Sequence, residues 1–97
     1  METQLATIEK EARIKNKYGL HARPAMQLVE LANRYSSKIE VSNGILAVDA
    51  KSIMSIMRLA ATKGTVLVIN ADGADAKEAA DALAELVQGG LGEMNGG

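Results

Sequence analysis

The chain has 97 residues, with 11 basic against 12 acidic side chains, no cysteine, one histidine and two aromatic residues. A chain of this length forms one domain that buries roughly 60 to 70% of its unfolded surface, and the lack of cysteine excludes disulfides and thiolate metal sites. The balanced charge and few aromatics disfavour nucleic-acid binding, and no apolar run approaches the ~20 residues of a membrane span, so we expect no membrane insertion, metal or cofactor.

The first predicted elements are a strand and a helix. Apolar residues alternate with charged ones from Ile8 to Ile14, which indicates a strand with one buried face. From Ala22 to Arg34 the apolar residues recur at helical spacing, at Ala25, Leu28, Val29 and Ala32. We therefore predict a strand over 8–14 and a helix over 22–34.

The segment Gly19-Leu20-His21-Ala22-Arg23-Pro24-Ala25 places the only histidine at the start of this helix. Unpaired backbone amides and a partial positive charge at a helix N-terminus favour a bound anion. They also disfavour the imidazolium, so we expect a neutral ring that can attack phosphorus. On this interpretation His21 accepts a phosphoryl group, the Ala22 and Arg23 amides bind it, and the Arg23 guanidinium pairs with its oxygens. A simple capping or surface histidine is the alternative.

A hairpin and a short helix follow. Alternating apolar residues flank Asn43-Gly44, a strong hairpin signal, and predict strands over 39–41 and 46–50. Ser52 precedes an apolar helical run from Ile53 to Leu59 and suits an N-cap. Helical methionine is usually core filler, but an exposed, adaptable docking surface is the alternative for Met26, Ile53, Met54 and Met57.

The last predicted elements are a strand, a helix and a tail. Residues 65–69 are β-branched and apolar enough for a central strand. A helix is predicted over 76–88. Asp75 precedes it and Glu78 follows three residues later, which is a variant of the capping box, and Gly89-Gly90 ends the helix. We expect one domain over residues 1–90 and a flexible Gly-rich tail over 91–97. The order β-α-β-β-α-β-α indicates an α+β fold of two layers with an antiparallel sheet.

The heptad from Gly19 to Ala25 resembles the active-site signature of the histidine-containing phosphocarrier (HPr) family of the phosphoenolpyruvate-dependent sugar phosphotransferase system. Lys51-Ser52-Ile53-Met54 resembles the second signature of that family, at the family's spacing. The resemblance implies an open-faced sandwich with strand order 1-4-2-3 and phosphorylation of His21 on Nδ1, which gives pros-phosphohistidine. One departure is Tyr18, where relatives often have a small polar residue.

The resemblance also implies partners. Enzyme I would phosphorylate His21, Enzyme IIA components would receive the phosphoryl group for sugar uptake, and HPr kinase/phosphorylase would modify Ser52. The expected protein is a monomeric, cytoplasmic carrier rather than an enzyme, since no second titratable group can be assigned beside His21. The alternative is a regulatory module of nitrogen or catabolite control, which signals through the phosphorylation of His21 and Ser52 without sugar transport.

Overall fold

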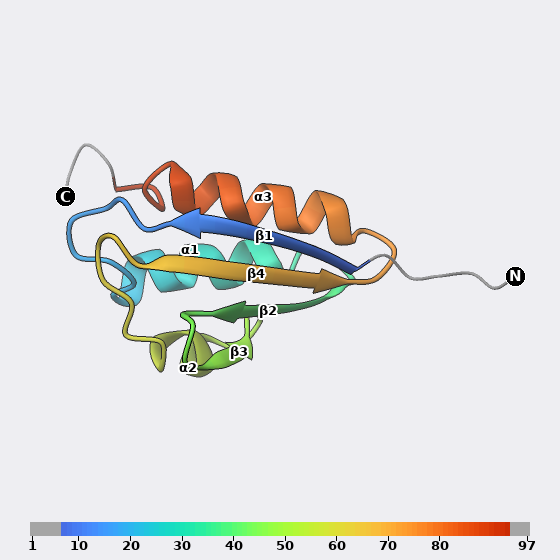
Figure 1. The fold of residues 1–97 in the computed structure, drawn as a ribbon, viewed down its shortest axis with the longest axis horizontal. Coiled ribbons are helices and arrows are strands. Elements are labelled where there is room, and N and C mark those ends of the chain that lie inside the picture. Colours follow the sequence, from blue (N-terminus) through green and yellow to red (C-terminus); the bar gives the residue numbers. More distant parts are fainter. Residues whose placement is uncertain (1–6, 94–97) are drawn as a thin grey trace, which may run out of the picture.

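The computed structural model describes residues 7–93; residues 1–6 and the last four residues of the predicted tail lie outside it. Seven elements follow one another in the predicted order of strands and helices (Figure 1). They are β1 (Thr7–Arg13), α1 (Ala22–Ala32), β2 (Lys38–Ser42), β3 (Ala47–Asp49), α2 (Ile53–Met57), β4 (Val66–Asp72) and α3 (Ala76–Gln88).

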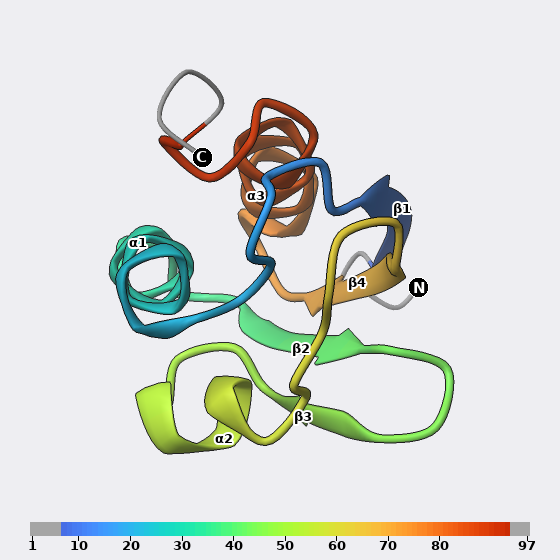
Figure 2. The same cartoon turned by 90° about the vertical axis from the view of Figure 1, so that its left-hand side faces the viewer.

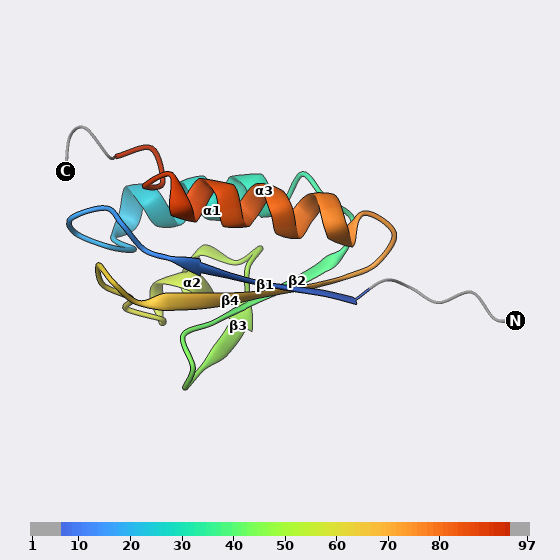
Figure 3. The same ribbon diagram turned by 45° about the horizontal axis from the view of Figure 1, so that its top comes forward.

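The four strands form one antiparallel sheet in the order β1-β4-β2-β3. Strand β4 is central, with Val68 opposite Glu11 of β1 on one side and Ser42 of β2 on the other. Helices α1 and α3 cover the same face of the sheet (Figure 3), while α2 lies beside α1 near β3 (Figure 2). The α+β open-faced sandwich and its strand order are therefore confirmed.

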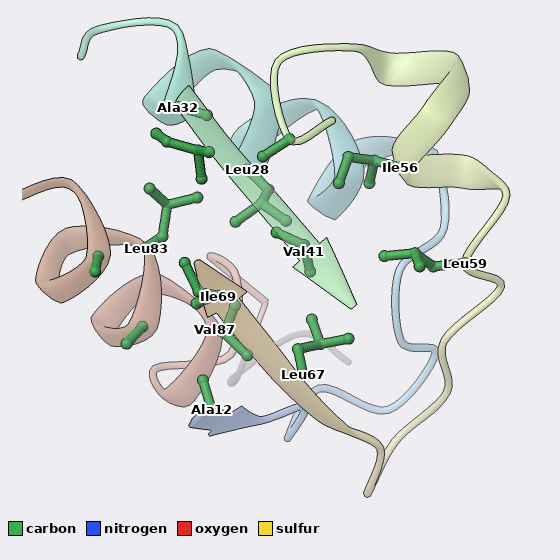
Figure 4. Close-up of a cluster of buried hydrophobic side chains, with 14 of the residues drawn as sticks. Ala12, Leu28, Ala32, Val41, Ile56, Leu59, Leu67, Ile69, Leu83 and Val87 are labelled. Atoms are coloured by element: carbon green, nitrogen blue, oxygen red, sulfur yellow. The ribbon is translucent and has the colours of Figure 1, made fainter. Parts of the chain in front are cut away.

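One apolar core lies between the sheet and the two long helices (Figure 4). On β4 the inward residues are Leu67, Ile69 and Ala71, which alternate with half-buried ones on the open face. Every second residue of the strand is buried, and buried residues recur about every 3.6 residues along the helices. Each element therefore has one apolar face, and these faces pack against each other. The fully buried helical residues that meet these strands include Ala25, Leu28 and Ala32 of α1, and Ala76, Ala79, Ala80, Leu83 and Val87 of α3.

The predicted hairpin at Asn43-Gly44 has a four-residue loop, because Ser42 pairs with Ala47. The Asn43 carboxamide oxygen accepts bonds from the amides of Ile45 and Leu46, both at 2.9 Å. Leu46, predicted in the second strand of the hairpin, belongs to the loop: its amide donates to this side chain, its carbonyl accepts Asn43 N at 3.2 Å, and β3 begins at Ala47. Gly44 has a φ of +95°, a conformation that favours glycine.

The capping box predicted for α3 does not form. Asp75 is the N-cap residue, but its side chain makes no capping hydrogen bond. Its carboxylate instead accepts bonds from the Ser37 hydroxyl and from the backbone amides of Ser36 and Ser37, each amide at 2.9 Å. The bond from the Ser37 hydroxyl and the bond from the Ser36 amide hold the pKa of the Asp75 carboxyl at about 2, below its ordinary 3.8. Asp75 thus joins the loop after α1 to the start of α3.

Helix α3 ends in a Schellman motif, in which Leu91 donates to Leu86 O at 2.8 Å and Gly90 donates to Val87 O at 3.1 Å. Gly90 has a φ of +94°, as the motif requires. Leu91 was expected in the flexible tail, but its side chain is fully buried. The apolar residue that follows the left-handed glycine of this motif commonly packs back on the helix, which explains the difference.

Candidate functional site

The loop before α1 is held against the loop before β4. Ile14 N donates to Thr65 O and Leu20 N donates to Ala61 O, both at 2.9 Å. Gly19 lies between these contacts with a φ of +66°, and a Cβ there would be 2.3 Å from Ala61 O. Only glycine fits this approach, so Gly19 sets the position from which the chain enters α1.

Asn16 closes the same loop from inside. Its side chain is buried, and its Nδ2 donates to Gly19 O at 2.7 Å, while Gly19 N donates to Asn16 O at 3.2 Å. These two bonds close the turn from Asn16 to Gly19. Sequence reasoning missed Asn16, although an asparagine three residues before a glycine is a recognisable turn signal.

His21 is the N-cap residue of α1. Its backbone is extended, its carbonyl accepts the amide of Ala25 at 3.0 Å, and its side chain makes no capping hydrogen bond. The ring is 44% exposed and is therefore accessible to a partner molecule. A histidine used simply as a cap would turn a ring nitrogen onto the helix amides, so the capping alternative does not describe this side chain.

The start of α1 leaves few amides for an anion. The first intrahelical bond comes from Ala25, and Pro24 has no N–H, so helix geometry leaves the amides of Ala22 and Arg23 directed out of the N-terminus. Both residues are exposed, as is the side chain of Arg23. These are the two amides that the sequence predicts to donate hydrogen bonds to a bound phosphoryl group.

A carboxylate lies beside the histidine. Glu93 Oε1 is 2.9 Å from His21 Nε2 and accepts a second bond from Asn16 Nδ2 at 3.2 Å. The Glu93 side chain is 16% exposed, although it lies 72 residues from His21 in the chain. The expectation that no second titratable group stands beside His21 is therefore wrong, because Glu93 comes from the segment that the sequence predicts to be a flexible tail.

Tyr18 lies at the edge of the site. Its ring stands edge-on to that of His21, with 6.2 Å between centroids, and is 63% exposed. Lys17 Nζ is 5.2 Å from the centroid of the tyrosine ring.

Ser52 caps α2 as predicted, since its Oγ accepts the amide of Ser55 at 3.3 Å. The preceding residue ties this helix start to the end of α1. Lys51 Nζ donates to Tyr35 O at 2.7 Å, and Lys51 O accepts Asn33 Nδ2 at 3.2 Å. The helix ends at Met57, two residues earlier than predicted.

The methionines of α1 and α2 are exposed rather than core filler. Met54 is 75% exposed and Met26 is 50% exposed, while Met57 and Ile53 are exposed to a smaller extent, at 41% and 37%. Because α1 and α2 pack side by side, these residues belong to neighbouring helices. We call Met26, Ile53, Met54 and Met57 the apolar patch.

Two further observations concern metal binding and membrane-spanning helices. Within residues 7–93 no three side chains of histidine, cysteine, aspartate or glutamate gather as a metal site. No helix in this part of the chain is long and apolar enough to cross a membrane.

The four-stranded sheet in the order β1-β4-β2-β3, with its helices on one face, is the architecture of solved HPr structures. One of them, HPr-C-His from Thermoanaerobacter tengcongensis, superposes with a TM-score of 0.84 and 45% identity, covering 89% of this chain and 97% of that one. The phosphocarrier protein HPr of Cupriavidus necator is 42% identical over 89% of this chain and 97% of its own length.

Residues 8–89 match the family described as "PTS HPr component phosphorylation site". The chain belongs to this family and is a phosphocarrier protein of the HPr type. It is also 42% identical to part of the multiphosphoryl transfer protein of Haemophilus influenzae, over 82% of this chain and 17% of that protein.

Proposed function

We propose that His21 carries the phosphoryl group on Nδ1, receiving it from Enzyme I and passing it to Enzyme IIA components for sugar uptake. The His21 ring is exposed at the N-terminus of α1, beside the first residues of the helix, Ala22 and Arg23, and this placement supports the proposal. Nε2 is engaged by Glu93, so Nδ1 is the ring nitrogen available for attack.

The site suits a group that is held briefly. A helix N-terminus stabilises an anion by typically ~0.3 to 1 kcal/mol, and by ~2 kcal/mol when partly buried. The exposed Arg23 guanidinium adds a charge-assisted hydrogen bond to the phosphoryl oxygens. Because this stabilisation is modest and the site is open to solvent, the phosphoryl group remains transferable to the next protein.

Partner binding and regulation belong to the same proposal. The apolar patch docks Enzyme I and Enzyme IIA in turn, because exposed methionines adapt to different surfaces. HPr kinase/phosphorylase phosphorylates Ser52, which adds ~1.5 to 2 negative charges at the start of α2. The helix start tolerates this charge, while an incoming phosphorylated donor is repelled. The carrier acts as a monomer in the cytoplasm.

The direct test is phosphorylation with purified Enzyme I, magnesium and phosphoenolpyruvate. The wild type should acquire an acid-labile phosphoryl group that peptide mapping places on His21, and His21→Ala should acquire none. Ser52→Ala is the control, because it removes a phosphorylatable residue elsewhere and should still be labelled. Equal labelling of His21→Ala and the wild type would refute the acceptor assignment.

Onward transfer separates this function from the regulatory alternative. The phosphorylated wild type, mixed with a panel of Enzyme IIA proteins, should lose its label to at least one of them. Retention of the label against every Enzyme IIA protein would favour a regulatory module.

A further inference from the structure

Glu93 is placed by the end of α3 rather than by the loop that carries His21. After the Schellman motif, buried Leu91 anchors the segment, and Glu93 N donates to Gly90 O at 2.9 Å. Gly92 between them has a φ of +81° and packs beside the Gln27 side chain of α1. The end of α3 and the start of α1 lie at the same end of the molecule (Figure 1).

The hydrogen bonds at Glu93 indicate which nitrogen of the His21 ring holds the proton. An ionised carboxylate only accepts, so a bond to it requires the proton on Nε2. Asn16 Nδ2 donates both to the same Oε1 and to Gly19 O, so it holds the carboxylate against the loop that precedes His21. In the neutral ring the proton on Nε2 leaves the lone pair on Nδ1.

We propose that Glu93 is a positioning residue for phosphoryl transfer, which holds the His21 ring as the Nε2–H tautomer and stabilises the positive charge that the ring gains. This inference rests on the proposed function of His21. Glu93 lies beyond residues 8–89, the stretch that matches the family. The contact is therefore supplied by the part of the chain that follows the matched region.

Phosphoryl transfer from the donor to His21 requires no proton transfer. The Nδ1 lone pair forms the bond to phosphorus, and the bond between phosphorus and the donor breaks with its electron pair left on the donor. The proton stays on Nε2, so the ring becomes cationic while it carries the phosphoryl group. A carboxylate 2.9 Å from Nε2 offsets this charge, as an acidic side chain does for a histidine that it orients.

The test uses the full chain and the variants Glu93→Gln, Glu93→Asp and Glu85→Gln. Glu85→Gln is the matched control, because Glu85 is an exposed carboxylate on α3 beside Lys10 and Glu11 of β1. The single histidine gives one set of ring ¹⁵N resonances, which report the Nε2–H fraction at mildly alkaline pH. The second measurement is the rate of His21 phosphorylation by Enzyme I.

Glu93→Gln should lower the Nε2–H fraction toward that of a free histidine side chain and slow phosphorylation roughly tenfold. Glu93→Asp should recover part of both, and Glu85→Gln should match the wild type. If Glu93→Gln matches the wild type in both measurements while the wild type is phosphorylated on His21, the positioning role is wrong and the proposed function stands. An unphosphorylated wild type whose tautomer still depends on Glu93 would refute the proposed function and support the contact.

Discussion

At the scale of the residue, Arg23 combines two kinds of donor. Its backbone amide points out of the N-terminus of α1, and its guanidinium is exposed in the same turn. The amide is retained by any substitution other than proline, whereas the guanidinium is lost with the side chain. A substitution therefore separates the contribution of the charge from that of the helix.

We expect Arg23→Ala to keep the fold and to slow phosphoryl transfer. A hydrogen bond to a charged group contributes about 1.5 to 3 kcal/mol, which corresponds to a rate roughly ten to a hundred times lower. Arg23→Lys should be intermediate, because a point charge cannot bind the phosphoryl group in two places. Stopped-flow transfer rates check this, and rates for Arg23→Ala equal to the wild type would exclude a role for the guanidinium.

Asp75 acts on stability. Its carboxyl has a lower pKa in the folded protein, about 2 against 3.8, so the unfolded chain binds more protons between these values. The stabilisation is therefore complete above the unfolded pKa of the carboxyl and is lost as pH falls through the folded one.

Asp75→Asn should lower the midpoint of urea unfolding at neutral pH, and its difference from the wild type should shrink as pH falls from 3.8 to about 2. Asp72→Asn is the control, because within residues 7–93 the Asp72 carboxylate accepts a single hydrogen bond from another side chain, the Thr7 hydroxyl at 3.2 Å. It should change the midpoint less at neutral pH. A difference between Asp75→Asn and the wild type that does not depend on pH would contradict the assignment.

At the scale of the element, α2 is short and relies on its cap. The five residues Ile53–Met57 are too few for a stable isolated helix, so the Ser52 cap and the buried side chain of Ile56 hold it in place. Aspartate is also a good N-cap, whereas alanine is a poor one. Substitutions at Ser52 can therefore separate the role of charge from that of capping.

Ser52→Ala should cost about 1 kcal/mol of unfolding free energy, and Ser52→Asp should cost less. For phosphorylation by Enzyme I the order should reverse, with Ser52→Asp slower than Ser52→Ala at low salt. The difference should shrink as salt shortens the Debye length from ~10 Å at 0.1 M to ~3 Å at 1 M. Equal rates for the two folded variants at low salt would leave Ser52 as a helix cap alone.

At the scale of the whole molecule, the apolar patch lies on α1 and α2, the helices whose N-cap residues are His21 and Ser52. Another exposed apolar residue, Ile45, lies at the tip of the β2–β3 hairpin and is 95% exposed. Ile45 thus offers an apolar surface of similar kind outside the two helices.

We predict that Met54→Gln weakens binding to Enzyme I by about 1 kcal/mol, or roughly fivefold in Kd, because the methionine loses its apolar contact with the partner. Glutamine is a good helix former, so stability should be unchanged. Ile45→Gln, the matched control, should bind as the wild type. Titration calorimetry measures both, and equal losses for the two variants would show that the docking surface extends beyond the apolar patch.

Local patterns in the sequence determined much of this protein. Three local patterns each depend on neighbours a few residues away. They are the alternation of buried residues in β4, the helical spacing of apolar residues around Leu28 in α1 and Leu83 in α3, and the cap at Ser52. The candidate acceptor also depends on a local pattern, because His21, Arg23 and Pro24 lie within four residues and act on the same helix start. The strand order was expected only through the resemblance to a known family.

Only the tertiary structure decided which distant groups meet. Asp75 has the identity of a capping residue, yet its carboxylate binds Ser36 and Ser37, because folding brings the loop after α1 to the start of α3. Glu93 belongs to a Gly-rich stretch without periodicity, and burial of Leu91 is what carries it to His21. Contacts of this kind form when the core packs, so short-range propensity and spacing contain no signal for them.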